Sequence, residues 1–129
     1  MEKQQIDQFI LSDDHADKMV KEAENIAKNE IQQVSASQIR NIYGAIKKLE
    51  MSSYNEKVYR QLVLIKPKLA YMKGRASNKH KGDYINLEKI FGTAIDAVKK
   101  EDEETFRRFC QFIEAILAYH KVYGDKNNA

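Results

Sequence analysis

The scarcity of helix-breaking residues is the feature that most constrains the fold of this 129-residue chain. The sequence contains one proline, Pro67, and five glycines, and apolar residues recur at spacings of three and four through most of its length. Such spacing places apolar side chains on one face of an α-helix, and no stretch shows the alternating pattern of a β-strand. The sequence therefore predicts an all-α fold, a bundle of five or six helices joined by short turns.

The chain length fits one domain, which we expect to span residues 1–129. Two alternatives stay open for residues 1–12, a short helix or a mobile docking arm, and residues 125–129 are expected to fray. No apolar run is long enough for a transmembrane span, and the N-terminus lacks the apolar core of a signal peptide. Cys110 is the only cysteine, so we expect neither an internal disulfide nor a cysteine metal cluster, as in a reducing cytoplasm.

Polar residues that suit helix N-termini predict where the helices begin. They are Asp13 and Asp14, Ser35 with Gln38 as its capping-box partner, Ser52, Ser53 and Asn55 together for the next turn and cap, Asp83 and Asp102. Pro67 has no amide hydrogen and its ring clashes with a preceding helical turn, so a helix must stop or kink near Ile65. A new short helix is then predicted from Pro67 to about Arg75, followed by a basic loop over residues 77–82.

Positive charge is concentrated in the middle of the chain. Residues 1–36 carry four Lys/Arg against eight Asp/Glu, residues 37–82 carry eleven against two, and residues 83–129 carry seven against nine. The most basic stretch, residues 57–81, holds eight Lys/Arg and no acid. Such a run repels itself and is stabilised when a polyanion lies against it. A basic centre with acidic flanks indicates a nucleic-acid-binding surface, although a solvated charged face is the alternative.

The candidate phosphate ligands are cations of this basic region. On the helix after Ser35 the apolar stripe leaves one basic ridge, and further cations surround the proline break and the loop: Arg40, Lys47, Lys48, Lys68, Lys73, Arg75, Lys79 and Lys81. Tyr71 is a candidate for stacking on a base, and a core position is its alternative. Tyr43 and Tyr119 are predicted to be core residues.

The C-terminal helix invites a catalytic or zinc interpretation because it holds Cys110, Glu114 and His120. Their spacing gives no Cys–His or His–His ligand pair, so we predict no catalytic residue, no metal ligand and no cofactor. Glu114 is expected to accept a hydrogen bond from a buried Arg or Tyr, and Cys110 to be a small core residue. The phenylalanines at 106, 109 and 112 are spread widely around this helix. Burial within the bundle and contact with another subunit both explain that spread.

Three segments taken together resemble the small subunit of type III-A CRISPR–Cas interference complexes, the Csm small-subunit family. They are SASQIRNIYGAI (35–46), LVLIKPKLAYMKGR (62–75) and FCQFIEAILAYHKVYG (109–124). The likeness spans residues 35–124, and residues 1–34 carry no matching motif. Family members often continue with a second glycine after the one that matches Gly124, where this chain has Asp125.

The resemblance implies a non-enzymatic RNA-binding subunit of a ribonucleoprotein in antiviral defence. Several copies would stack beside the backbone and large subunits and hold CRISPR RNA and target RNA without reading sequence, with no membrane involved. The matching motifs place Arg40, Lys66, Lys68, Arg75, His120 and Lys121 in family positions, which adds Lys66 and Lys121 to the RNA-binding candidates.

Two rival functions remain. A homo-oligomeric helical adaptor would use the basic centre to bind an acidic protein partner. A small nuclease would use Glu114 and His120 and would require a metal ion.

Overall fold

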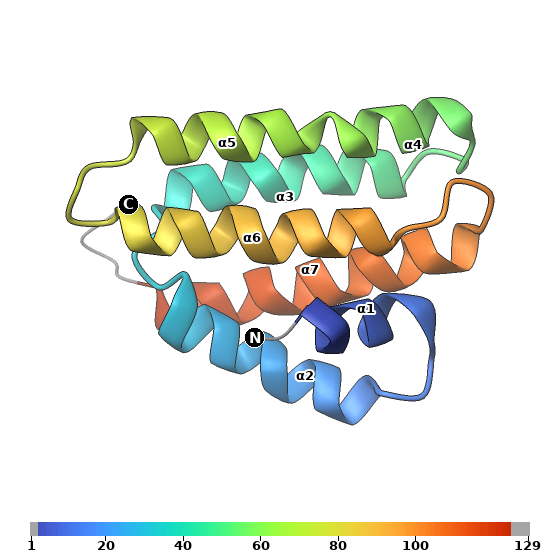
Figure 1. Cartoon of the computed structure of the whole chain (residues 1–129), viewed down its shortest axis with the longest axis horizontal. Coiled ribbons are helices and arrows are strands. Elements are labelled where there is room, and N and C mark those ends of the chain that lie inside the picture. The colour runs from blue at the N-terminus through green and yellow to red at the C-terminus, as the bar shows by residue number, and fades with distance from the viewer. Residues whose placement is uncertain (1–2, 125–129) are drawn as a thin grey trace.

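The computed structural model describes residues 3–124, and within them the chain consists of helices and connecting turns (Figure 1). The α-helices are α1 (Lys3–Leu11), α2 (Ala16–Asn25), α3 (Ala36–Glu50), α4 (Glu56–Val63), α5 (Ile65–Arg75), α6 (Lys81–Ala97) and α7 (Glu103–Tyr123). The residues predicted to fray, 125–129, lie outside the described part of the chain. Over residues 3–124, no helix is both long enough and apolar enough to cross a membrane.

The predicted all-α bundle is confirmed. A π-helical turn, Ile26–Glu30, continues α2. Leu64 alone separates α4 from α5, and these two helices form one nearly straight rod along the bundle (Figure 1). Counted as rods, residues 3–124 therefore make six, which agrees with the predicted five or six.

The break between α4 and α5 lies where the proline predicts it. α4 ends at Val63 and α5 starts at Ile65, so Pro67 is the third residue of α5. Amides of the first helical turn have no partner within the helix, and a proline there costs no hydrogen bond. Because the break is a single residue, α5 continues in nearly the direction of α4 (Figure 1).

Three of the predicted helix caps are confirmed. Each accepts a hydrogen bond from a backbone amide of the first turn: Ser35 from Gln38 at 3.2 Å, Asn55 from Val58 at 2.9 Å and Asp102 from Glu104 at 3.0 Å.

The caps predicted at Asp83 and at Asp13 or Asp14 are wrong. α6 begins at Lys81, inside the stretch expected to be a loop, and the Asp83 carboxylate instead accepts from the amide of Gln33 at 2.7 Å. α2 begins at Ala16 with no side-chain cap. Asp83 thus bonds across the bundle, to a residue 50 positions away, which local sequence does not reveal.

The last helix, α7, is the centre of the bundle. It packs against α1, α2, α3 and α6, and its phenylalanines Phe106, Phe109 and Phe112 are fully buried. Of the two explanations for their wide spread around the helix, the structure shows burial within the bundle. A helix covered on several sides needs apolar residues all round.

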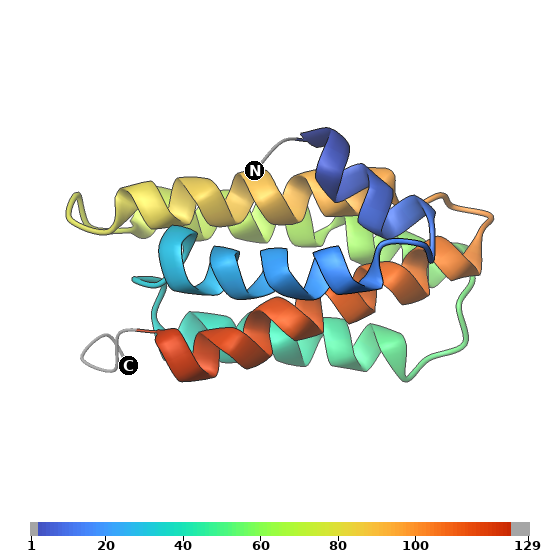
Figure 2. The same ribbon diagram turned by 90° about the horizontal axis from the view of Figure 1, so that it is seen from below.

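Helix α1 is docked on the bundle in this structure, so Lys3–Leu11 form a short helix. Phe9 is buried against Phe112, with ring centroids 5.5 Å apart. The Arg108 guanidinium donates to the Ile10 carbonyl at 3.0 Å and to the Asp13 carboxylate at 2.6 Å. α1 and α2 lie on the side of the bundle away from α4 and α5 (Figure 2), which leaves the outer face of α5 and α3 uncovered.

Candidate nucleic-acid interface

A groove runs between α3 and the α4–α5 rod. It consists of two adjoining hollows of about 490 and 540 Å³, which share Ala45, Ile65 and Lys68. We call it the α3–α5 groove. Its lining residues are Gln38, Asn41, Ile42, Gly44, Ala45, Lys48, Leu49, Ser52, Lys57, Val58, Gln61, Ile65, Pro67, Lys68, Leu69, Tyr71, Met72 and Arg75.

The charge of this groove is entirely positive. Lys48, Lys57, Lys68 and Arg75 line it, and its lining includes no Asp or Glu. All four cations are exposed, and none of them pairs with an acid within residues 3–124. Unpaired cations along one concave surface suit the phosphates of a strand that lies in it.

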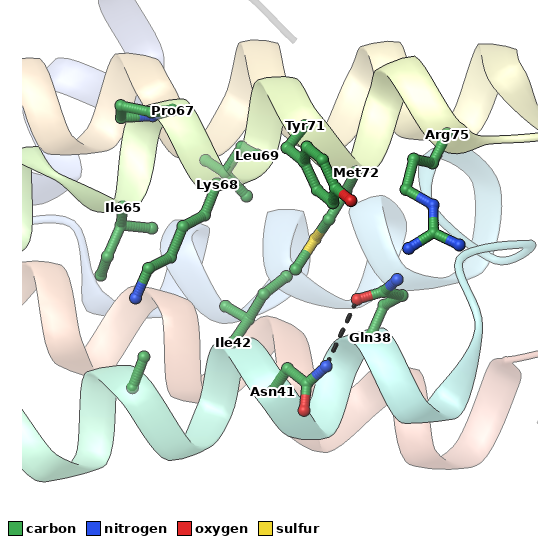
Figure 3. Close-up of a pocket in the computed structure, with 11 residues that line it drawn as sticks. Gln38, Asn41, Ile42, Ile65, Pro67, Lys68, Leu69, Tyr71, Met72 and Arg75 are labelled. Carbon is green, nitrogen blue, oxygen red and sulfur yellow. Dashed lines mark hydrogen bonds between the residues drawn. The ribbon is translucent and has the colours of Figure 1, made fainter.

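Helix α5 divides its cations between two faces. Lys66 pairs with Asp96 at 2.6 Å, and Lys73 pairs with Glu88, both acids of α6. Lys68 and Arg75 point toward α3 instead (Figure 3). The sequence grouped these four residues as one set of candidates, because nothing in the basic stretch reveals that α6 supplies two acids to one of its faces.

Tyr71 lies in the groove between the two α5 cations (Figure 3). Its side chain is 64% exposed, and the Arg75 guanidinium lies 5.7 Å from the ring centroid. The alternative of a core position for Tyr71 is therefore wrong. A guanidinium at this distance attracts the electron-rich face of the ring, which favours a ring position beside Arg75.

Arg40 and Lys121 lie together on the other flank of α3. They line a hollow of about 780 Å³ between α3 and α7, together with Tyr43 and Glu114. The prediction that Tyr43 is a core residue is wrong, since the residue is 42% exposed. α3 packs its Ile39, Ile42 and Ile46 stripe inward, and Tyr43 lies at the margin of that stripe, beside the hollow.

The remaining candidates lie outside the α3–α5 groove. Lys47 pairs with Glu50 at 3.1 Å, and this hydrogen bond raises the pKa of the lysine. Lys79 is in the α5–α6 connection, and Lys81 is the first residue of α6. The structure thus gathers Lys48, Lys68 and Arg75 in one groove and distributes the other candidates over neighbouring surfaces.

Lys57 was not among the candidates chosen from sequence, although it lies in the basic stretch. Its helical spacing from Lys68 could have identified it as a residue of the same surface. Gln61, Ile65 and Lys68 follow it at steps of four, four and three residues, which places all four on one side of the α4–α5 rod, and all four line the groove.

The expected partner of Glu114 was a buried Arg or Tyr, and this prediction is wrong. Glu114 faces another carboxyl group, that of Glu50 on α3, and its Oε1 atom is buried without a conventional donor within residues 3–124. Burial, and then the hydrogen bond with Glu50, raise the pKa of Glu114 to about 7, and nearby Lys47 opposes them. The same hydrogen bond lowers the pKa of Glu50. Below about pH 7 the Glu114 carboxyl group therefore keeps its proton, while Glu50 beside it is ionised.

This proton makes stability depend on pH. The pKa of Glu114 is raised in the folded chain, so its contribution is fully present below the unfolded pKa and is lost as pH rises through about 7. We expect the free energy of unfolding of the wild type to fall by about 1–2 kcal/mol between pH 5 and 8. Water in the open hollow screens part of the repulsion between the two carboxylates, which keeps this loss small. Glu114→Gln should flatten this loss in urea unfolding at each pH. If the free energy of unfolding depended on pH in the same way for both proteins, the pKa of Glu114 would not be raised by the fold.

The residues that a nuclease would need are not brought together. His120 is buried beside the backbone of residues 31–34, and burial lowers its pKa, whereas Glu114 faces α3. Burial raises the pKa of the Cys110 thiol to about 12, as expected for a core cysteine. Within residues 3–124, no three His, Cys, Asp or Glu side chains are placed to hold a metal ion.

The fold and the groove together define a small helical-bundle protein with a concave cationic surface. A family model described as Csm2 Type III-A matches residues 13–126, most of the chain. The chain therefore belongs to the Csm2 family, the small subunits of type III-A CRISPR complexes, which confirms the resemblance found in the sequence. A curated relative, "CRISPR system Cms protein Csm2" from Streptococcus thermophilus, is 47% identical over 34 residues, which are 26% of this chain and 28% of the relative. No solved structure matched the chain.

Proposed function

We propose that this chain is a non-catalytic, RNA-binding small subunit of a cytoplasmic type III-A CRISPR ribonucleoprotein. It holds guide and target RNA through the α3–α5 groove without reading sequence. Several copies stack beside the other subunits of the complex, so that their grooves follow one RNA path. Membership of the Csm2 family supports the assignment to the complex, and the groove supports the mode of binding.

The observation that carries this proposal is the groove lining, which includes four cations and no acid. None of these cations makes an ion pair with any residue that the structure describes. Phosphates that lie against Lys and Arg release condensed counterions, and this release drives binding irrespective of base sequence. The lining also has no His or Cys, and so it lacks the side chains that serve most often as general acid, general base or metal ligand. A positioning role follows better from this surface than a chemical one.

Titration of the purified chain with labelled single-stranded RNA at several salt concentrations tests the proposal. If each groove cation neutralises one phosphate, the logarithm of the association constant falls with the logarithm of salt at a slope of about −3. RNAs of unrelated sequence should give similar constants. Absence of salt-sensitive binding at micromolar protein would favour the adaptor that binds an acidic protein.

Two lysines of α5 provide a matched comparison. Lys68→Ala removes a groove cation, and we expect it to weaken RNA binding roughly fivefold near 0.1 M salt and to flatten the salt slope by about 0.7. Lys66→Ala removes the same charge from the face paired with Asp96, so RNA affinity should stay close to that of the wild type. Fluorescence anisotropy measures both. Equal losses would mean that total charge, rather than the groove, determines binding.

A further inference from the structure

The end of the α3–α5 groove that carries Tyr71 differs from a simple phosphate track. Its hollow of about 490 Å³ combines an exposed aromatic ring, apolar side chains and two amide side chains with the cations Lys68 and Arg75 (Figure 3). Phosphate binding explains the cations but not the aromatic ring, the apolar side chains or the amides. We propose that this hollow is a binding pocket for one unpaired RNA base, turned out of its stack and seated against Tyr71, and this inference rests on the function proposed above.

The aromatic ring is placed to receive a base. Tyr71 projects from α5 over the hollow toward α3, and Arg75 lies on the side away from Lys68 (Figure 3). With the guanidinium 5.7 Å from the ring centroid, one ring face is taken by a cation, and the face toward Lys68 stays available for stacking. Because the Arg75 guanidinium attracts the ring, the ring has less freedom to lose when a base stacks on its other face.

The floor of the hollow is apolar. Ile42 of α3 and Leu69 of α5 are buried beneath it, and the partly buried Met72 of α5 also lines it (Figure 3). The flat face of a base can lose contact with water when it enters such a hollow. A phosphate is charged, and the same loss of water would be costly for it. Met suits bases of different shape because its side chain is flexible and polarisable.

The α3 wall supplies hydrogen-bonding groups that do not select one base. Gln38 and Asn41 line the hollow from α3, and the Asn41 amide nitrogen lies 3.5 Å from the Gln38 amide oxygen, at the outer limit of a hydrogen bond (Figure 3). Each amide offers both donors and an acceptor, so it can pair with the edge of a purine or a pyrimidine. The pocket thus accepts any base, consistent with binding that does not read sequence.

The cations flank the pocket on both sides. Lys68 lies between the Tyr71 hollow and the rest of the groove, and Arg75 lies at the far end of the hollow. A base that enters the hollow therefore places its own phosphates near both side chains. This arrangement, with a base on an aromatic ring and the adjacent backbone on cations, is the usual one for single-stranded nucleic acids.

The test uses 2-aminopurine placed once in an oligouridylate and an otherwise identical RNA with an abasic ribose at that position. The chain has no tryptophan, so the probe can be excited with little interference from the protein. We expect the probe fluorescence to change on binding and the abasic RNA to bind more weakly than the base-containing RNA. Tyr71→Ala should weaken binding of the base-containing RNA roughly 5- to 150-fold and leave the abasic RNA nearly unaffected. Tyr71→Phe keeps the ring and should retain most of the affinity.

Each outcome separates the pocket from the general proposal. If the wild type and Tyr71→Ala both bind base-containing and abasic RNA with equal, salt-sensitive affinity, the base pocket is wrong and the phosphate-binding groove is retained. If Tyr71→Ala weakens binding of abasic RNA as much as binding of base-containing RNA, the pocket is also wrong. The ring would then affect the protein fold or contact the RNA backbone rather than a base. No binding of any RNA by the folded wild type overturns both.

Discussion

The triple variant Lys48→Glu/Lys68→Glu/Arg75→Glu is expected to bind single-stranded RNA at least about 100-fold more weakly than the wild type near 0.1 M salt. Each lost phosphate contact costs roughly fivefold at that salt concentration, so three contacts account for this factor, and the new carboxylates add repulsion. All three side chains are exposed and carry no ion pair within residues 3–124. The fold should therefore survive, which far-UV circular dichroism checks.

A second triple variant controls for net charge. Lys18→Glu/Lys21→Glu/Lys89→Glu makes the same charge change on α2 and α6, at exposed side chains outside the groove. Its RNA affinity should fall far less than that of the groove variant, since only long-range, screened repulsion changes. Equal losses for the two variants would mean that the positive surface is not localised, and the proposed interface would be abandoned.

Phe9→Ala is expected to lower the free energy of unfolding by about 3–5 kcal/mol. Phe9 is 2% exposed and contacts Phe112 of the central helix, so its removal leaves a cavity where α1 meets α7. Urea unfolding measures the loss. Leu11→Ala, on the same helix but 45% exposed, should cost much less.

The double variant Phe9→Ala/Phe112→Ala measures the coupling between the two rings. Because they are in contact, their losses should not add, and we expect a coupling of about 0.5–1.5 kcal/mol. A loss below about 1 kcal/mol for Phe9→Ala would instead mean that residues 1–12 are an arm that leaves the bundle in solution. That result would bear on assembly, because an undocked arm is free to contact another subunit.

Much of the architecture was predictable because its causes are local. The apolar spacing predicted the helices, and Pro67 predicted the break between α4 and α5. The caps Ser35, Asn55 and Asp102 marked the starts of three helices. The predictions that failed involve partners far away in sequence. Asp83 accepts a hydrogen bond from Gln33, and Glu114 meets Glu50, contacts that exist only after segments 50 or more residues apart are packed together.

The candidate site divides in the same way. The sequence by itself determined a helical bundle with positive charge concentrated in residues 37–82, because helix periodicity and charge are properties of the chain before it folds. Only the tertiary structure decided which cations are available to a ligand. α6 brings Asp96 and Glu88 against Lys66 and Lys73, whereas α3 brings no acid to Lys68 and Arg75. An ion pair depends on the distance between side chains, and that distance is set by helix packing.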